Sequence, residues 1–273
     1  MGAKPFFKHV GGKTQVVDTL IKYIPENFEA YHEPMVGGGA LFWSLSNSGW
    51  LKGKQVYLSD INPKIIEAYQ AVRDYPDQFI ESLELYKRQY YKDPESLYYR
   101  IRDAWNAGHQ PPASFVFLKQ TSFNGLWRCN RQGKINMSWG KYKNPNIVDP
   151  ETIRQCSQSL QGVSLECAGF EKSGKQIKTG DVVYYDPPYW GTFDLYTSDG
   201  FGMEKHLDLL RLCSSLSRNC VRVIYSNEDS KKFREILESY WYCDVTTVPT
   251  RRYVNCSGVG REPVDDLIVV GKY

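Results

Sequence analysis

Residues 181–189, Asp-Val-Val-Tyr-Tyr-Asp-Pro-Pro-Tyr, join an apolar run to a rigid polar turn. The run at 181–185 is almost continuously apolar, which is typical of a strand buried on both faces of a parallel sheet. The two prolines that follow fix φ and lack a backbone N–H, and they leave carbonyls that are free to accept hydrogen bonds. Such a turn can direct the Asp186 carboxylate and the Pro187 carbonyl to one point beside the Tyr189 ring. Two acceptors next to an aromatic ring suit an exocyclic amine on a planar base.

Further strands and helices are predicted on both sides of this run. Apolar runs predict strands at residues 55–60, 163–167, 221–225 and 267–270, and a short strand at 30–34 is predicted to run into the turn at 36–39. Helical spacing of apolar residues predicts helices at 13–24, 205–216 and 230–240, and another that carries Leu41, Phe42 and Leu45. Apolar strands that alternate with helices indicate a doubly wound α/β domain, with a mainly parallel sheet covered on both faces.

The middle of the chain has a different pattern. Residues 62–109 are predicted to be helical, with breaks at Tyr75-Pro76 and Asp93-Pro94 because proline does not continue a helix. Between residues 121 and 143 the helical period fails, and glycines separate short aromatic stretches, which indicates a β-hairpin or an irregular loop.

These patterns divide the chain into two predicted domains. Residues 1–61 and 158–273 form the sheet domain, and residues 62–157 form an insert within it. A chain of 273 residues is long enough for such an elaborated α/β domain.

The composition is that of an ordinary globular protein, with 41% apolar and 24% charged residues and a formal net charge of +3. No stretch approaches the roughly 18 apolar residues of a membrane span, and the N-terminus lacks a signal-peptide pattern. Seven cysteines, an odd number without any CxxC pair, indicate reduced thiols rather than disulfides or a zinc site. We expect a soluble cytosolic protein that needs no metal.

Residues 127–143 combine positive charge with aromatic rings and contain no acidic residue. The basic residues are Arg128, Arg131, Lys134, Lys141 and Lys143, and the rings are Trp127, Trp139 and Tyr142. This mixture suits a surface that meets phosphates and stacks on nucleic-acid bases. A solvated basic loop is the alternative.

A glycine triplet, Gly37-Gly38-Gly39, follows the strand predicted at 30–34. Glycines there let a ligand approach the backbone, and Asp60, 21 residues after Gly39, ends the next strand, where it can accept ribose hydroxyls. A tight turn and a helix cap are the alternatives. The chain has neither a GxGxxG pattern nor a GxxxxGK[ST] loop, so adenosine without a polyphosphate fits better than a dinucleotide or triphosphate.

Seven segments, in the same order along the chain, resemble the Dam-type N6-adenine DNA methyltransferases, the alpha group of the D12 class. They are residues 7–13 (FKHVGGK), 33–39 (EPMVGGG), 59–62 (SDIN), 123–128 (FNGLWR), 186–189 (DPPY), 225–229 (YSNED) and the basic segment 251–261. The resemblance implies a Rossmann-like methyltransferase fold, an S-adenosyl-L-methionine-binding catalytic domain and an inserted DNA target-recognition domain. It also implies methyl transfer to N6 of a flipped-out adenine in double-stranded DNA.

The resemblance assigns roles to three groups of residues and to no metal ligand. The catalytic residues are Asp186, Pro187, Pro188 and Tyr189. The residues expected to contact the cofactor are His9, Lys13, Gly37, Gly38, Gly39, Asp60, Phe170 and Asp186. The residues expected to contact DNA are Lys8, Phe123, Asn124, Leu126, Arg128, Asn130 and Arg131.

Individual DNA contacts follow from the same resemblance. Lys8 and Arg128 match residues that contact guanine, which implies a GATC-like target. Phe123 matches an aromatic wedge, and Asn124 matches a residue that helps to handle the extruded base. The stretch at 190–202, with Trp190 and Tyr196, could close over that base, or it could be a rigid surface loop.

Three positions depart from the family pattern. His9 stands where the family has Trp, and Ser138-Trp139 stands where it often has Pro-Phe. Gly169 stands where an acidic residue usually contacts the cofactor adenine, although Phe170 could still stack on it.

Two other functions stay open. A cytosine-N4 DNA methyltransferase also acts on an exocyclic amine, but such enzymes more often have Ser in place of Asp186. A catalytically idle S-adenosylmethionine-dependent DNA-binding protein would be free to lose the turn at 186–189. Cytosine C5 methylation relies on a cysteine in a Pro-Cys context, which this chain lacks. We expect a monomer or weak dimer on DNA, associated with the nucleoid in the cytoplasm of a bacterial or phage-infected bacterial cell.

Overall fold

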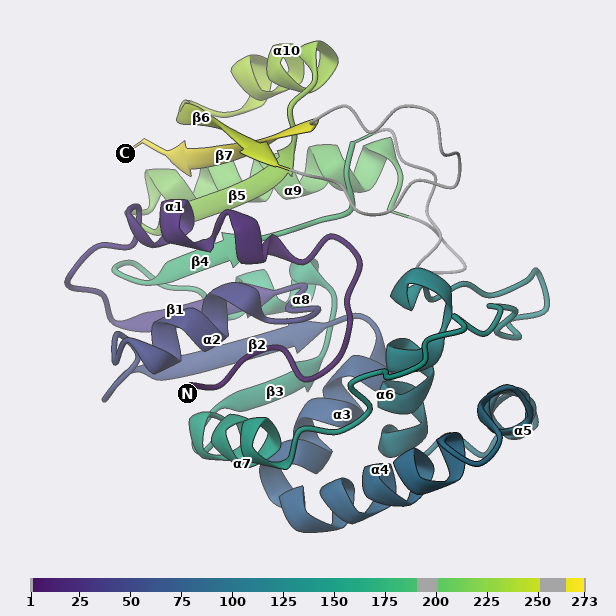
Figure 1. Cartoon of the computed structure of the whole chain (residues 1–273). Coiled ribbons are helices and arrows are strands. Elements are labelled where there is room, and N and C mark those ends of the chain that lie inside the picture. Colours follow the sequence, from purple (N-terminus) through teal and green to yellow (C-terminus); the bar gives the residue numbers. More distant parts are fainter. Residues whose placement is uncertain (1, 191–200, 251–263, 273) are drawn as a thin grey trace. The chain divides into compact units, whose positions relative to one another are not determined.

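Figure 1 shows the computed structural model, which describes residues 2–190, 201–250 and 264–272. The chain forms two compact units. The helical unit comprises Met1–Gly12, Gly37–Ser48 and Asn62–Gln161. The sheet unit comprises Lys13–Val36, Gly49–Ile61 and Gly162–Tyr273. Each unit is therefore made of segments that are far apart in the sequence.

Seven strands of the described residues form one sheet in the sheet unit, in the order β3-β2-β1-β4-β5-β7-β6. The strands are β1 (Ala30–Pro34), β2 (Gln55–Asp60), β3 (Ser164–Cys167), β4 (Val182–Tyr185), β5 (Arg222–Glu228), β6 (Cys243–Thr250) and β7 (Val264–Gly271). Strands β1 to β5 pair in parallel, whereas β7 is antiparallel to both β5 and β6. The predicted mainly parallel, Rossmann-like α/β sheet is confirmed, and β6 is an additional strand that the sequence patterns did not predict.

Helices α9 (Met203–Arg218) and α10 (Lys231–Tyr240) cover one face of the sheet. The strand residues that point to this face are Val183, Tyr185, Val223, Tyr225, Leu267 and Val269. They share one buried cluster with Leu209 and Cys213 of α9 and Phe233 of α10. In Figure 1, α9 lies behind the sheet and α1 (Val17–Ile21) lies in front of it, so helices lie on both faces.

The helix predicted at 13–24 is shorter in the structure. A 3₁₀ turn at Lys13–Gln15 precedes α1, which has only five residues. β-Branched side chains are frequent in this segment, and they lose χ1 freedom in a helix. The predicted helices at 205–216 and 230–240 correspond to α9 and α10 and are confirmed.

The order of the parallel strands reverses between β1 and β4, where Tyr31 pairs with Val182 and His32 with Val183. In open α/β sheets, ligands bind beyond the carboxyl ends of the strands at such a switch point. Because β4 ends at Tyr185, the turn at 186–189 leaves the sheet there.

The helical unit contains six α-helices among its described residues. They are α2 (Ala40–Asn47), α3 (Pro63–Asp74), α4 (Pro76–Tyr90), α5 (Pro94–Asn106), α6 (Pro112–Thr121) and α7 (Pro150–Ser159). Helices α3 to α7 all begin with proline, whose missing N–H is not needed in the first turn. The breaks predicted at Tyr75-Pro76 and Asp93-Pro94 are confirmed, whereas α6 and α7 were not predicted.

Residues 122–142, which we call the hairpin, have no regular strand ladder. Two isolated bridges join its limbs, Ser122 with Trp139 and Cys129 with Ile135, and a 3₁₀ turn at Phe123–Gly125 begins it. The prediction of a hairpin or irregular loop is confirmed, since the segment has features of both.

No helix within residues 2–190, 201–250 and 264–272 combines the length and apolar composition needed to cross a bilayer. The assignment of cofactor binding to residues 1–61 and 158–273, and of DNA recognition to residues 62–157, stays a prediction.

Candidate active site and DNA-reading hairpin

Asp186 lies directly after β4 and is held through one of its two carboxylate oxygens. Its Oδ1 is 2.7 Å from Nζ of Lys13 and accepts a hydrogen bond of 2.8 Å from Oγ of Ser226. The side chain is 23% exposed, and in the described part of the chain Oδ2 has no hydrogen bond or ion pair. One oxygen therefore orients the carboxylate, and the other stays available to a donor.

Lys13 is buried, with only 6% of its surface exposed. Burial acts against its charge, yet Asp186, Tyr189 and Asp266 together outweigh burial and raise the pKa of Lys13 above its ordinary value. The ammonium group also lies 4.9 Å from the centroid of the Tyr189 ring, a cation–π distance. Lys13 thus contacts both the acid and the aromatic ring of the turn at 186–189.

Tyr189 is fixed through its hydroxyl, which donates a hydrogen bond of 2.9 Å to Oδ1 of Asp266, a buried carboxylate on β7. Burial, opposed by Lys13 and reinforced by Asp266 and Asp186, raises the pKa of Tyr189 to about 12. The phenol is therefore neutral at physiological pH, and its ring has a defined orientation.

Asn227, on β5, holds the far end of the same turn. Its Oδ1 accepts a hydrogen bond of 2.8 Å from the backbone N–H of Trp190, and its Nδ2 donates one of 3.4 Å to the carbonyl of Pro188. The carbonyl of Pro187 accepts no hydrogen bond from the residues that the structure describes. Of the two proline carbonyls, the one predicted to face the substrate is thus the one without a protein donor.

Ser226, Asn227 and Asp266 support this turn, and none of them was assigned a role from the sequence. Ser226 and Asn227 lie in the segment 225–229 that resembles the family, and that signal could have pointed to them. Asp266 follows Asp265 in β7 and directly precedes the apolar run at 267–270, and a buried acid beside such a run is itself a signal of function.

The glycine turn at 37–39 lies in the helical unit together with His9. Gly37 and Gly39 have positive φ, at 48° and 66°, and a Cβ on Gly37 would stand 2.8 Å from Nε2 of His9. Trp43 donates a hydrogen bond of 2.9 Å to the carbonyl of Gly38, and Tyr69 donates one of 3.2 Å to that of Gly37. Only glycine fits at position 37, and its carbonyl direction is fixed.

Asp60 and Phe170, two other candidate cofactor residues, lie in the sheet unit. Asp60 is the buried last residue of β2, and its carbonyl accepts a hydrogen bond of 3.0 Å from Ala168. Phe170 begins α8 (Phe170–Ser173), is 3% exposed and meets the ring of Phe201 edge to face at 5.9 Å. Phe170 belongs to the core cluster under α9, and stacking on an adenine stays a prediction.

An acidic group does lie next to Gly169, although residue 169 itself carries none. A Cβ on Gly169 would be 2.6 Å from Oε2 of Glu171. The carboxylate of Glu171, two residues further on, therefore occupies the space that a side chain at position 169 would need.

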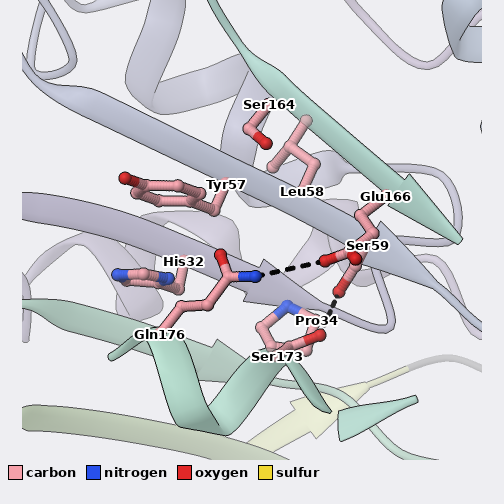
Figure 2. A pocket seen from close by; sticks show the side chains of 9 residues that line it. All are labelled: His32, Pro34, Tyr57, Leu58, Ser59, Ser164, Glu166, Ser173 and Gln176. Carbon is pink, nitrogen blue, oxygen red and sulfur yellow. Dashed lines mark hydrogen bonds between the residues drawn. The ribbon is translucent and has the colours of Figure 1, made fainter. Parts of the chain in front are cut away.

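Figure 2 shows a separate small cavity of the sheet unit, among β1, β2, β3 and the turns after β3. Polar side chains on its walls are joined by a hydrogen bond of 2.7 Å between the Ser59 and Ser173 hydroxyls and one of 3.3 Å from Gln176 to Glu166. His32 lines it and is paired at 2.9 Å with Asp181, while burial lowers the pKa of His32. None of the predicted site residues lines this cavity.

Lys8 lies beside the hairpin in the helical unit. Its Nζ donates a hydrogen bond of 3.2 Å to the carbonyl of Gln120 and lies 3.9 Å from the centroid of the Tyr142 ring. The same tyrosine accepts a hydrogen bond of 3.1 Å at its hydroxyl from the backbone N–H of Asn124. The structure therefore brings Lys8 and Asn124, both predicted to contact DNA, to one aromatic residue.

The remaining DNA candidates occupy the hairpin. Phe123 is 52% exposed, as a wedge would be, and Asn124 has a positive φ of 53°. Arg128 and Arg131 are exposed, and Leu126 is partly buried. Asn130 stabilises the turn of the hairpin, since its Oδ1 accepts hydrogen bonds from the backbone N–H groups of Gln132 and Lys134.

Two predicted features lie outside the described residues, namely Tyr196 with its glycine-containing stretch and the basic segment 251–261. Among the residues that the structure does describe, no group of three or more His, Cys, Asp and Glu side chains is arranged to hold a metal.

The chain matches the family model of the D12 class N6 adenine-specific DNA methyltransferases over residues 9–251. It is 30% identical to the type II methyltransferase M.MjaIII of Methanocaldococcus jannaschii, over an alignment that covers 96% of each chain. It is also 30% identical to the type II methyltransferase M1.LlaDCHI of Lactococcus lactis, over 97% of this chain and 94% of that one. The DNA adenine methylase of Escherichia coli K12 is 28% identical, over 98% of this chain and 95% of its own length.

These matches extend over nearly the whole chain. The substrate is DNA, the modified base is adenine and the cofactor is S-adenosylmethionine. The chain therefore belongs to the D12 class of N6 adenine-specific DNA methyltransferases.

Proposed function

We propose that the chain methylates N6 of an adenine that is flipped out of double-stranded DNA, at a GATC-like site. One observation carries the proposal. Oδ2 of Asp186 and the carbonyl of Pro187 have no donor among the described residues, while their neighbours, Oδ1 of Asp186 and the carbonyl of Pro188, are bound within the protein. Two acceptors at one turn match the two N–H groups of an exocyclic amine.

The two acceptors would act on the nucleophile. Adenine N6 is a weak nucleophile because its lone pair is delocalised into the ring. Hydrogen bonds from the amine to Asp186 and Pro187 favour a more tetrahedral nitrogen, whose lone pair is then free to attack the methyl carbon. The N–C bond forms as the methyl–sulfur bond breaks, and the amine releases one proton to water. Because Lys13 and Ser226 already hold the Asp186 carboxylate, little reorganisation is needed during the reaction. The mechanism needs no covalent enzyme intermediate.

Base flipping is part of the proposal because pairing in a duplex hides N6. The Tyr189 ring would replace the stacking that the flipped adenine loses. Its hydrogen bond to Asp266 and its contact with Lys13 support this role, since they fix the ring before a base arrives. Pro188 would contribute by keeping the turn rigid.

S-Adenosylmethionine supplies an electrophilic methyl group. The residues that we propose to hold it are His9, Lys13, Gly37, Gly38, Gly39, Asp60, Phe170 and Asp186. The glycine turn fits a ligand that approaches the backbone closely, because it has positive φ and no Cβ at Gly37. The carboxylate of Asp60, at the carboxyl end of β2, fits ribose hydroxyls.

For the DNA sequence, we propose that Lys8 and Arg128 read guanines and that Phe123 wedges into the base stack next to Asn124. The exposure of Phe123 and of the Arg128 side chain supports this. Leu126, Asn130 and Arg131 would contribute further hairpin contacts, with Asn130 acting mainly through the shape of its turn.

The reaction is tested with tritiated S-adenosylmethionine and unmethylated duplex DNA, followed by digestion and identification of the labelled nucleoside. We expect label in N6-methyladenine nucleoside, and a rate at least about 100-fold lower for Asp186→Ala. The matched control is Asp208→Ala, which changes an exposed acid of α9. Label on cytosine N4, or an unchanged rate for Asp186→Ala, would contradict the proposal.

Flipping is tested with a duplex that carries 2-aminopurine at the target adenine. Its fluorescence should rise on binding, because the base leaves the stack. Tyr189→Ala should bind the duplex with a smaller rise, and an unchanged low signal with the wild-type chain would argue against extrusion.

A further inference from the structure

The second limb of the hairpin is attached to α5 by side chains. Asn106, the last residue of α5, makes two hydrogen bonds to a single residue of that limb. Its Nδ2 donates to the carbonyl of Ile135 at 3.0 Å, and its Oδ1 accepts from the N–H of Ile135 at 2.9 Å. The hydroxyl of Tyr98, also on α5, donates to the carbonyl of Met137 at 3.1 Å. Ile135 and Met137 are both 3% exposed, so α5 fixes the inward residues of the limb.

The residue between them points outward. Asn136 is exposed, and its Oδ1 accepts a hydrogen bond of 3.0 Å from Nε of Arg128 on the opposite limb. The two residues are also joined through the backbone, since the N–H of Asn136 donates to the carbonyl of Arg128 at 3.1 Å. An extended segment alternates its sides, so fixing Ile135 and Met137 sets the direction of Asn136.

This arrangement leaves one edge of the Arg128 guanidinium for a ligand. Nε is bound to Asn136, whereas Nη1 and Nη2 make no hydrogen bond or ion pair with the residues that the structure describes. A guanidinium distinguishes guanine from other bases by two parallel hydrogen bonds to O6 and N7, so its position and tilt decide how well it discriminates. A free arginine samples many rotamers, and a bound Nε restricts them.

We propose that Asn106 is a specificity-determining positioning residue, which fixes the position and tilt of the Arg128 guanidinium through Ile135 and Asn136. This rests on the proposed role of Arg128 in reading a base. Asn106 acts at the end of α5 through the backbone of the hairpin, since both the nitrogen and the oxygen of its amide are hydrogen-bonded to Ile135.

The experiment measures site preference on duplexes with a randomised target, sequenced after methylation. Asn106→Ala should lower the preference for the base pair read by Arg128 by about 3- to 10-fold, the scale of one or two hydrogen bonds, and leave other positions unchanged. Gln110→Ala is the matched control, because it removes an amide that binds the carbonyl of Trp105 near the end of the same helix. Its profile should equal that of the wild type.

Preference is a ratio within one sample, so a lower fraction of folded protein does not change it. Asn106→Asp keeps the acceptor for the Ile135 N–H but places a carboxylate oxygen against the Ile135 carbonyl, and its loss of preference should be at least as large as that of Asn106→Ala. In the Arg128→Ala background, Asn106→Ala should cause no further loss at that position, because the two residues act as one unit.

The outcomes separate the two proposals. A uniform loss of rate with an unchanged profile in Asn106→Ala would make Asn106 merely structural and overturn the inference. A profile changed by Arg128→Ala but not by Asn106→Ala would also overturn it and leave the reading role intact. An unchanged profile with Arg128→Ala would overturn both.

Discussion

The hydroxyl of Tyr189 and the buried carboxylate of Asp266 form a hydrogen bond of 2.9 Å that joins the turn after β4 to β7. Strand β7 is antiparallel to its neighbour β5. A residue of this antiparallel strand therefore supports the turn that follows the parallel strand β4. The orientation of the Tyr189 ring thus depends on a strand that is not adjacent to β4.

Tyr189→Phe keeps the ring and removes only the hydroxyl. We expect the free energy of unfolding to fall by about 0.5–1.5 kcal/mol, because Asp266 loses one donor in a buried position. Methylation should slow by less than about 10-fold, whereas Tyr189→Ala, which removes the stacking ring, should lose about 1–3 kcal/mol of transition-state stabilisation. Thermal unfolding and single-turnover rates on one duplex measure both, and equal rate losses in the two variants would speak against stacking.

Lys13→Met breaks a largely buried ion pair. We expect the free energy of unfolding to fall by roughly 1–3 kcal/mol, because Asp186 keeps its charge without its partner but is partly hydrated. The pKa of Lys13 is raised in the folded chain, so its contribution is complete below the unfolded value near ~10.4 and is lost only as pH rises through the folded value.

Urea unfolding of the wild type and of Lys13→Met at several pH values tests this. The difference in the free energy of unfolding between the wild type and Lys13→Met should be constant from about pH 7 to about pH 10 and should shrink above that. Lys172→Met, at an exposed lysine, is the control and should show little difference. A difference that vanishes between about pH 7 and pH 9 would refute the assignment.

Lys119 is a buried cation on α6, 2% exposed, with no hydrogen bond or ion pair of its side chain in the described residues. Burial lowers the pKa of Lys119 to about 7. Between that value and the unfolded value of ~10.4 only the unfolded chain binds the proton, so stability should rise with pH across this window.

Lys119→Met should therefore stabilise the protein, by on the order of 1–4 kcal/mol at about pH 6, with a gain that fades toward about pH 10. Denaturant midpoints at three pH values measure this. A variant that is less stable than the wild type at low pH would show that Lys119 has an acceptor when it is charged.

Glu171→Ala tests whether this carboxylate replaces the acid missing at Gly169. We expect S-adenosylmethionine to bind about 3- to 10-fold more weakly, since one hydrogen-bonding group is lost, with little change in stability because the side chain is 53% exposed. Isothermal titration calorimetry measures the affinity, and Glu204→Ala in the first turn of α9 is the control. Equal affinity in both variants would exclude Glu171 as a contact.

Local chemistry explains which elements could be predicted. Proline at the first position marks the starts of α4 and α5, and β2 has the predicted bounds around its apolar centre, Val56-Tyr57-Leu58. Strand β1 also has the predicted bounds, although its sequence, AYHEP, is not an apolar run. Helix α6 was missed because every residue from 113 to 121 is buried, so its apolar pattern has no helical period. Strand β6 was missed because only one of its eight residues is buried, at the sheet edge, and it depends on pairing with β7.

The candidate site was predictable in part for a similar reason. The turn at 186–189 is rigid because of its own two prolines, so its rigidity could be predicted without knowledge of the fold. The support from Asp266 and Asn227 depends on which strands become neighbours, and no local pattern determines that. Tertiary pairing alone brings these side chains to Tyr189 and Pro188.

The attachment of the hairpin to α5 has a consequence for how such proteins diverge. Its second limb is anchored through the main chain of Ile135 and Met137, so the outward side chain at position 136 and the arginine opposite can be exchanged while the anchors stay the same. A lineage could in this way acquire a new target sequence through a few substitutions on one surface, without rebuilding the helices beneath it.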